Sequence, residues 1–592
     1  MPADRGADLL TSHLLPETAF TALAEGTADP ATVGLLRDAQ LSKHLMLLHA
    51  IAEAADVPGA GPAAFRAGYA LLAELQATED GGDWLLGLPH LGSWAHDCLI
   101  RLEQGSGADF AHFACLAAAA AIRGGVPFEL DVPVRDGRVL LPGLGFITIT
   151  DERSSVRLCC DGDRVTAGRH FAAGRRCLIP DDGSGGPVPH WSGTPLIRAV
   201  ADGLTWHALL ETEDSYLDRY TLPMATGLRA EDVQHWRQRA QAAWEVLVRD
   251  HRWAAEPLPG VVSVIVPLTP HRETDLVSVT TPAAFGAIAT SWPPDPVTMA
   301  ETLVHEGQHV KLCGLLDMVP LVTSGGEKVY APWRQDPRPA GGLLQGVYAH
   351  LGIARFWAAQ RHAETDPDDI LRAQVHFARW RSMIDQAAQT LLRTDCLTPA
   401  GVRFVNLLRA RGQQLETEPV PGDAREIAGQ VALDHRLTWQ LRHLAIDPAG
   451  VANLAAARRR GEPARDQARP ATWIEADTRK VDASVRSRLL TMRYLAPARF
   501  RELCADGTLA LSEADRLLVS GRAQAAVLAY RDEITASADP RPDAWIGLAL
   551  ALAQLPSSPL QRAFGADLAL IFEVHTCLGG RADPLDLASW FA

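Results

Sequence analysis

Lysine is scarce in this sequence, since only Lys43, Lys311, Lys328 and Lys480 occur among 56 basic residues. Acidic residues outnumber the basic ones, and the formal net charge is -15. A surface that binds phosphates needs basic character at least locally, so this balance argues against nonspecific binding of nucleic acid. We therefore expect no nucleic-acid partner.

Long apolar runs are also missing. None approaches the roughly 20 residues that a membrane-spanning helix requires. The first eight residues lack the basic start and the apolar block of a secretory signal. The sequence therefore predicts a soluble protein with no membrane partner, located in the cytoplasm.

Paired cysteines and phosphate-binding glycine loops are absent as well. The nine cysteines are scattered and form no C-x-x-C pair, which indicates reduced thiols rather than a zinc ribbon or a disulfide frame. No glycine-rich turn has the spacing of a nucleotide-binding loop between a strand and a helix.

The residue patterns divide the chain into regions of different character. Residues 1–124 are rich in leucine and alanine without a period of two, which favours packed helices. Residues 125–228 hold short β-type runs separated by glycine-containing turns and predict a β-rich region. Residues 229–460 form the expected metal-binding catalytic domain, and residues 461–592 a helical C-terminal domain.

The predicted fold class is α+β and predominantly helical. A zincin-like metal helix follows short strands, and the C-terminal domain is all-α. Within that domain, residues 514–530 and 544–551 resemble one tetratricopeptide-type helix pair. A plain helical domain is the alternative, because one such pair cannot bury its own apolar face.

An H-E-x-x-H box carries the clearest chemistry in the sequence. Asp295 and Pro296 predict the start of its helix, and the box lies in the middle of the apolar run that follows. On a helix, His305 and His309 lie one turn apart on the same face, so both imidazoles can reach one metal ion beside Glu306.

Two histidines leave at least one metal ligand to be found. Leu312 and Leu315 occupy the places of the metzincin glycine and histidine, which excludes that continuation. The next strong helix, residues 343–357, contains no acid that could serve as the glutamate of a gluzincin. His350 lies at its centre among small residues, and we predict that it is the third ligand. Three histidines suit zinc and ferrous iron alike.

A loop between the two helices supplies possible anion-binding groups. Tyr330, Arg334 and Arg338 lie on a proline-stiffened segment, and two arginines beside a metal could clamp a carboxylate. A peptidase that cuts within a chain does not need such a clamp, whereas an oxygenase that uses α-ketoglutarate does. The alternative is a surface loop whose arginines pair with acids.

Three ordered motifs then match a known family. H-E-x-x-H is followed by x-x-L-x-x-L-L-D, by P-W-R-x-D-P-R-P and by G-G-L-L-Q-G-x-Y-A-H-L-G. In this order they resemble the HExxH-motif proteins of ribosomal peptide natural product clusters, which are α-ketoglutarate-dependent peptide β-hydroxylases. The resemblance covers residues 260–360 and, more loosely, extends to Leu441.

The resemblance implies Fe(II), an α-ketoglutarate co-substrate and a ribosomally made precursor peptide whose side chain is hydroxylated at its β-carbon. Tyr330, Arg334 and Arg338 are then the candidates for binding the co-substrate. Glu306 is the candidate catalytic residue, and it could orient a water, accept a hydrogen bond or ligate the iron.

Two other functions remain open from the sequence. In a zinc metallopeptidase, Glu306 would be the general base that deprotonates a metal-bound water. In a precursor-binding scaffold without activity, the C-terminal helices would hold the peptide and the metal box would be vestigial.

Overall fold

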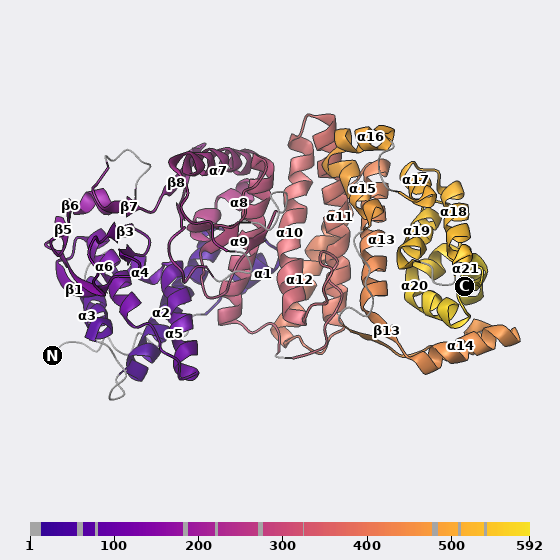
Figure 1. The fold of residues 1–592 in the computed structure, drawn as a ribbon, viewed down its shortest axis with the longest axis horizontal. Coiled ribbons are helices and arrows are strands. Elements are labelled where there is room, and N and C mark those ends of the chain that lie inside the picture. Colours follow the sequence, from indigo (N-terminus) through magenta and orange to yellow (C-terminus); the bar gives the residue numbers. More distant parts are fainter. Residues whose placement is uncertain are drawn as a thin grey trace. The chain divides into compact units, whose positions relative to one another are not determined.

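The computed structural model describes residues 14–55, 63–76, 81–180, 187–218, 223–269, 276–323, 325–475, 484–506, 511–537 and 541–592. Parts of the predicted N-terminal helical region, residues 1–13, 56–62 and 77–80, lie outside the described residues. The chain divides into two compact units, Met1–Leu321 and Val322–Ala592, which we call unit 1 and unit 2 (Figure 1).

The structure is mixed α and β, about 60% helical, with a helical C-terminal region, which confirms the predicted fold class at this level. The division between the units falls inside the predicted region 229–460, shortly after the H-E-x-x-H helix. None of the helices among the described residues is both long enough and apolar enough to cross a membrane.

Unit 1 begins with helices rich in leucine and alanine. They are α1 (Glu17–Ala24), α2 (Pro30–Ala55), α3 (Ala63–Gln76), α4 (Gly81–Leu86), α5 (Pro89–Glu103) and α6 (Ala111–Gly124). Helix α6 is the centre of this part, because its alanines let neighbouring elements approach and its residues from His112 to Ile122 are all buried. Trp94 of α5 stacks on Phe113 of α6 with ring centroids 5.3 Å apart.

Two antiparallel sheets follow in unit 1. One has the strand order β1-β4-β5-β6 and the other β2-β3-β7. The strands are β1 (Phe128–Pro133), β2 (Arg138–Leu141), β3 (Gly145–Thr148), β4 (Ser155–Cys160), β5 (Arg164–Ala167), β6 (Phe171–Gly174) and β7 (Trp191–Gly193). In β4 every second residue is buried, as expected for a sheet with one face on the core. A 3-10 helix, η2 (Arg175–Leu178), follows β6.

A third sheet positions the H-E-x-x-H helix. Its strand order is β11-β12-β10-β9-β8. The strands are β8 (Leu196–Ala201), β9 (Leu204–Leu210), β10 (Val264–Pro267), β11 (Ser278–Val279) and β12 (Ala287–Thr290). Strand β10 is parallel to both β9 and β12, and every residue of β10 and β12 is buried. The edge strand β11 runs antiparallel to β12.

The helices around this third sheet are α7 (Ala230–Asp250), α8 (Arg252–Ala255), η3 (Leu258–Gly260) and α9 (Pro296–Met318). Helix α7 packs on β8 and on α9, and α2 also packs on α9. The H-E-x-x-H helix α9 is therefore held within unit 1 by the sheet, by α7 and by α2.

A buried ionic cluster joins the helices of unit 1 to the loop after β9. His90 donates from Nε2 to Glu211 Oε2 at 2.9 Å, and both side chains are almost completely buried. His112 Nε2 lies 3.5 Å from Asp214 Oδ2 in the same interior. Burial alone would lower the pKa of His90, but the hydrogen bond and charge of Glu211 raise it above its ordinary value.

The His90–Glu211 pair predicts that unit 1 loses stability as the pH rises. A histidine whose pKa is raised by folding contributes its full stability below the pKa of the unfolded chain, about 6.5, and loses it as the pH passes through the folded value. We expect the free energy of unfolding to fall by up to about 1.4 kcal/mol per pH unit above about pH 6.5.

Urea unfolding followed by tryptophan fluorescence between about pH 6 and about pH 9 measures this slope. The Glu211→Gln variant is the control, because it removes the charge that raises the pKa of His90 and should flatten the slope. A wild-type stability that is constant or increases over this range contradicts the prediction.

Unit 2 is built of helices with one short hairpin. The helices are α10 (Ala340–Ala363), α11 (Pro367–Leu392), α12 (Pro399–Glu416), α13 (Gly422–His443), α14 (Pro448–Arg460), η4 (Ala464–Asp466), α15 (Val485–Leu495), α16 (Pro497–Asp506), α17 (Glu513–Val519), α18 (Ala523–Ala536), α19 (Pro542–Ala553), α20 (Pro559–Cys577) and α21 (Pro584–Phe591). The hairpin pairs β13 (Leu444–Ile446) with β14 (Thr472–Ile474). Helix α11 packs on α10, α12 and α13.

A fully buried arginine ties four helices of unit 2 together. The guanidinium of Arg486 on α15 lies 3.1 Å from Asp434 on α13, 3.3 Å from Asp515 on α17 and 2.7 Å from Asp543 on α19. Tyr530 on α18 also donates to Asp515, at 2.6 Å. The cluster thus joins α17, α18 and α19, which contain the residues 514–530 and 544–551 of the predicted helix pair.

Candidate functional site

Helix α9 begins and ends as its residues dictate. The side chain of Asp295 accepts a hydrogen bond from the backbone N–H of Thr298 at 2.8 Å, and Pro296 is the first helical residue, as predicted. Near the other end, Asp317 accepts hydrogen bonds from Gln40 and Lys43 of α2, both at 2.8 Å. Since an acid is unfavourable at a helix C-terminus, these contacts offset the cost of placing Asp317 there.

The two histidines of the box converge on one point. His305 Nε2 and His309 Nε2 are 3.2 Å apart, and the rings are nearly perpendicular, with an interplanar angle of 79°. Two nitrogens that each lie about 2.0–2.1 Å from one tetrahedral ion are about 3.3–3.4 Å apart. The separation in the structure is therefore close to that of two adjacent ligand positions of zinc or iron.

Both histidines are half-buried, while the residues between them are buried. Burial lowers the pKa of His305 to about 4, and the neighbouring His309 adds to this effect while Glu306 opposes it. His305 is therefore neutral near pH 7, and a neutral imidazole is the form that binds a metal.

Glu306 is fixed beside the histidine pair by the edge of the sheet. Only 1% of its surface is exposed, and its Oε2 accepts a hydrogen bond from Thr280 Oγ1 at 2.6 Å. The other oxygen, Oε1, lies 3.7 Å from His305 Nε2. Thr280 directly follows β11, a strand of only two residues, so sequence reasoning missed it.

The arginine loop of unit 2 is closed by backbone pairing. Val329 and Arg338 exchange two backbone hydrogen bonds, of 2.7 and 2.9 Å. Inside the loop, Arg334 Nε donates to Asp336 Oδ1 at 2.8 Å, and Arg338 Nη1 lies 3.3 Å from Asp336 Oδ2. Partial burial would raise the pKa of Asp336, but the two arginines hold it below its ordinary value.

The two predicted clamp residues therefore already bind one internal carboxylate. The side chains of both arginines remain partly exposed, Arg334 by 49% and Arg338 by 36%. A co-substrate carboxylate would have to share them with Asp336 or replace it. In the sequence, Asp336 lies between Arg334 and Arg338, close enough to form an ion pair with either of them.

The side chain of Tyr330 is directed toward the helices of unit 2. Its hydroxyl and Nδ1 of His435 on α13 share a hydrogen bond of 2.9 Å, and its ring packs edge-on against Trp439. Burial raises the pKa of Tyr330 and lowers the pKa of His435 to about 4, so the phenol stays protonated and the imidazole stays neutral.

His435 also lines a polar pocket of about 180 Å³ in unit 2. Arg379 of α11 and Arg442 of α13 lie in its wall, together with Gln335 of the arginine loop. Sequence reasoning missed this pocket, because its arginines are far apart in the chain and belong to different helices. It adds a second set of cationic groups to the neighbourhood of Tyr330.

His350 lies buried in the aromatic interior of unit 2. Its ring stacks on Trp333 with centroids 4.3 Å apart, and the ring of Trp380 lies 4.7 Å away. Its Nδ1 donates to the backbone carbonyl of Gly346 at 2.8 Å. Ligand histidines and packing histidines both make such contacts, and the role of His350 as third ligand stays a prediction.

Gly346 is required for the arginine loop to rest on α10. A Cβ atom at this position would lie 2.3 Å from Cζ2 of Trp333, which is closer than any normal contact. We expect Gly346→Ala to displace Trp333 and to lower the free energy of unfolding by about 1–3 kcal/mol through overpacking. Urea unfolding measures the loss, and Gly341→Ala is the matched control, because its Cβ would meet only an ordinary contact with Val322 at 3.8 Å.

A larger effect of Gly341→Ala than of Gly346→Ala would contradict this role of Gly346. The fluorescence of Trp333, followed in a variant that keeps it as the reporter tryptophan, should change when Gly346 is replaced by alanine. An unchanged fluorescence would also contradict this role of Gly346.

The predicted site residues belong to different units. His305, Glu306 and His309 lie in unit 1, and Tyr330, Arg334, Arg338 and His350 lie in unit 2. Within the part of the chain that the structure describes, no group of three or more histidine, cysteine, aspartate or glutamate side chains is arranged to hold a metal ion. What the structure brings together is the histidine pair, Glu306 and Thr280. Compared with known protein families and with curated proteins, the chain matches none.

Proposed function

We propose that this protein is an Fe(II)- and α-ketoglutarate-dependent hydroxylase that modifies a side chain of a ribosomally made precursor peptide at its β-carbon. The observation that carries the metal part of the proposal is the 3.2 Å separation of His305 Nε2 and His309 Nε2. The co-substrate and the peptide rest on the resemblance of the three ordered motifs.

In this proposal, His305 and His309 hold the metal, and His350 is the candidate for the remaining protein ligand. Iron bound there would supply the activation of dioxygen that hydroxylation of a C–H bond requires. Glu306 does not swing freely, because Thr280 holds its Oε2, so its Oε1 is the atom that could orient a bound water or the substrate.

The far carboxylate of α-ketoglutarate requires a cation. Arg334 and Arg338 are the candidates that the motifs supply, and the partial exposure of both leaves room for a second carboxylate beside Asp336. Tyr330 would act through His435, since its hydroxyl is engaged there.

Anaerobic protein mixed with Fe(II) and α-ketoglutarate tests the proposal directly. We expect a charge-transfer absorbance in the visible that needs both additions. With oxygen and a short peptide encoded beside this gene, we expect succinate and a peptide heavier by one oxygen atom. The absence of both the absorbance and the added oxygen would show that the proposal is wrong.

A zinc peptidase is the second candidate function, and one observation favours it. Zincin-like peptidases have an antiparallel edge strand beside the metal helix, and here β11 is such a strand, linked to Glu306 through Thr280. An edge strand can hold an extended peptide by main-chain pairing, and Glu306 could be the general base. Peptide cleavage with zinc alone, without α-ketoglutarate, would select this function.

The helices at the C-terminal end suggest how a peptide could be held in either case. We propose that α17, α18 and α19, which pack on one another, form a tetratricopeptide-like arrangement of a helix pair and one further helix. If the protein were a scaffold without activity, a peptide would bind equally well to a His305→Ala variant, and neither oxidation nor cleavage would occur.

A further inference from the structure

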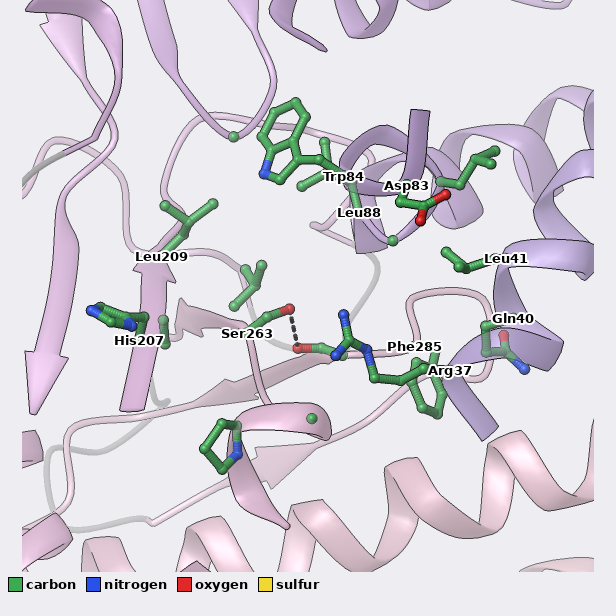
Figure 2. Close-up of a pocket in the computed structure, with 18 of the residues that line it drawn as sticks. Arg37, Gln40, Leu41, Asp83, Trp84, Leu88, His207, Leu209, Ser263 and Phe285 are labelled. Atoms are coloured by element: carbon green, nitrogen blue, oxygen red, sulfur yellow. Dashed lines mark hydrogen bonds between the residues drawn. The ribbon is translucent and has the colours of Figure 1, made fainter. Parts of the chain in front are cut away.

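One pocket of unit 1 lies outside the H-E-x-x-H motif and has no part in the proposed hydroxylation. It has a volume of about 490 Å³, which is within the range of pockets that bind small organic ligands (Figure 2). Its wall combines α2 and α4 with the ends of strands β8, β9 and β10 and the loop before β12.

The body of the pocket is apolar. Figure 2 shows Leu41, Trp84, Leu88, Leu209 and Phe285 around the cavity. Trp84 is held from two sides, because the guanidinium of Arg123 lies 5.2 Å from its ring centre and Gly143 lies directly against its ring. A guest therefore meets a rigid aromatic and aliphatic surface.

The charge at the pocket is positive, although the chain as a whole is acidic. Arg37 and Arg123 line the pocket, and Asp83 is the carboxylate among its lining residues. Arg37 is exposed and has no hydrogen-bond or ion-pair partner among the described residues. Arginines elsewhere in unit 1 bind carboxylates, as Arg157 binds Asp131 at 2.8 Å.

The polar groups deeper in the pocket are engaged with the protein. His44 donates from Nδ1 to the backbone carbonyl of Leu86 at 2.6 Å, and burial lowers its pKa, so it brings no positive charge. Ser263 donates to the carbonyl of Gly286, as the dashed line in Figure 2 marks. The guanidinium of Arg37 is thus a cationic group available to a guest.

We propose that this pocket binds a ligand with an apolar body and one negatively charged group, such as a carboxylate, which pairs with Arg37. A guanidinium without a protein partner can form charge-assisted hydrogen bonds with a carboxylate, while the leucines, Trp84 and Phe285 bury the remainder of the ligand. A free organic acid and an acidic, apolar segment of a peptide both supply this chemistry.

The pocket is connected to the metal-box helix through two of its lining residues. Phe285 lies against Gly314 of α9, where a Cβ would be 2.9 Å from its ring, and Gln40 donates to Asp317 of α9. Gly314 is five residues past His309, which is about 7.5 Å along the helix axis. A ligand in the pocket therefore touches residues that also touch α9.

Two fluorescent probes of the same shape test the proposal. Anilinonaphthalene sulfonate has an aromatic body with one negative charge, and N-phenyl-1-naphthylamine has the same body without the charge. We expect the anionic probe to bind metal-free wild-type protein, and Arg37→Gln to weaken its binding about tenfold, the loss of one hydrogen bond to a charged group. Binding of the neutral probe should change by less than about twofold.

Two further variants make the result specific. Leu209→Trp fills the pocket from β9 and should abolish binding of both probes while the circular dichroism spectrum is retained. Arg169→Gln removes the same charge from an exposed site of unit 1 that does not line the pocket, and it should leave both affinities unchanged. Equal affinity of the anionic probe for wild type and Arg37→Gln overturns the proposal.

Competition identifies the source of the ligand. Displacement of the anionic probe by 4-phenylbutyrate alone supports a free organic acid, and displacement by the capped peptide acetyl-Asp-Leu-Phe-amide alone supports a peptide segment. Displacement by neither overturns the proposal. Because the protein is free of metal in all of these measurements, their outcome does not depend on the proposed hydroxylation.

Discussion

Replacing His309 by alanine should weaken Fe(II) binding by more than about 100-fold and abolish the proposed hydroxylation, while the protein stays folded. Replacing a residue that only hydrogen-bonds to a metal ligand already lowers metal affinity by about 10–100-fold. His309 would itself supply one of the two converging ligand nitrogens, so its loss should cost more. The fold should persist because the imidazole is half-buried and its removal leaves the apolar face of α9 intact.

Calorimetric titration with Fe(II) under nitrogen measures the affinity, and thermal unfolding without metal checks the fold. His49→Ala is the matched control, since His49 is an exposed histidine of α2 that forms an exposed pair with Glu53. Retention of wild-type affinity in His309→Ala would remove the histidine pair as a metal site. His350→Ala, measured in the same way, decides whether His350 is a ligand or a packing residue.

Replacing Arg486 by methionine will destabilise unit 2 by about 3–5 kcal/mol, which is a large part of the roughly 5–15 kcal/mol by which a typical domain is stable. The guanidinium is completely buried, and its removal leaves Asp434, Asp515 and Asp543 without their common partner. Burial alone would lower the pKa of Arg486, but the three carboxylates raise it well above its ordinary value. The methionine fills the volume but neutralises none of these charges.

Limited proteolysis and urea unfolding of the full chain measure this loss. Arg488→Met is the control, because Arg488 is exposed on the same helix and its replacement should change the stability by less than about 0.5 kcal/mol. Adding Asp543→Asn to Arg486→Met should restore part of the stability, since it removes one uncompensated charge. Equal stability of the Arg486→Met and Arg488→Met variants would contradict the role of this cluster.

Local signals in the sequence predicted local structure well. Asp295 and Pro296 begin α9 as expected, because an N-cap and a first-turn proline act within a few residues. The spacing of His305 and His309 likewise fixes their common face, since four residues make about one helical turn. The strands β1 to β4 also lie where short apolar runs and turns indicated them.

Contacts between distant residues were beyond the sequence. Thr280 reaches Glu306 from a strand of two residues, too short for any periodicity to reveal. The partners of Arg486 come from three other helices, and nothing in the spacing of Asp434, Asp515 and Asp543 shows that they meet. The large pocket of unit 1 is likewise formed by segments that only the fold assembles.

The contacts of Asp317 link the opening of the last turn of α9 to that of α2. Because Asp317 is bound by Gln40 and Lys43, the last turn of α9 cannot fray without breaking its contacts to α2. Segments that open together exchange their amide hydrogens together. The amides in the last turn of α9 should therefore exchange together with those of α2 around Gln40 and Lys43.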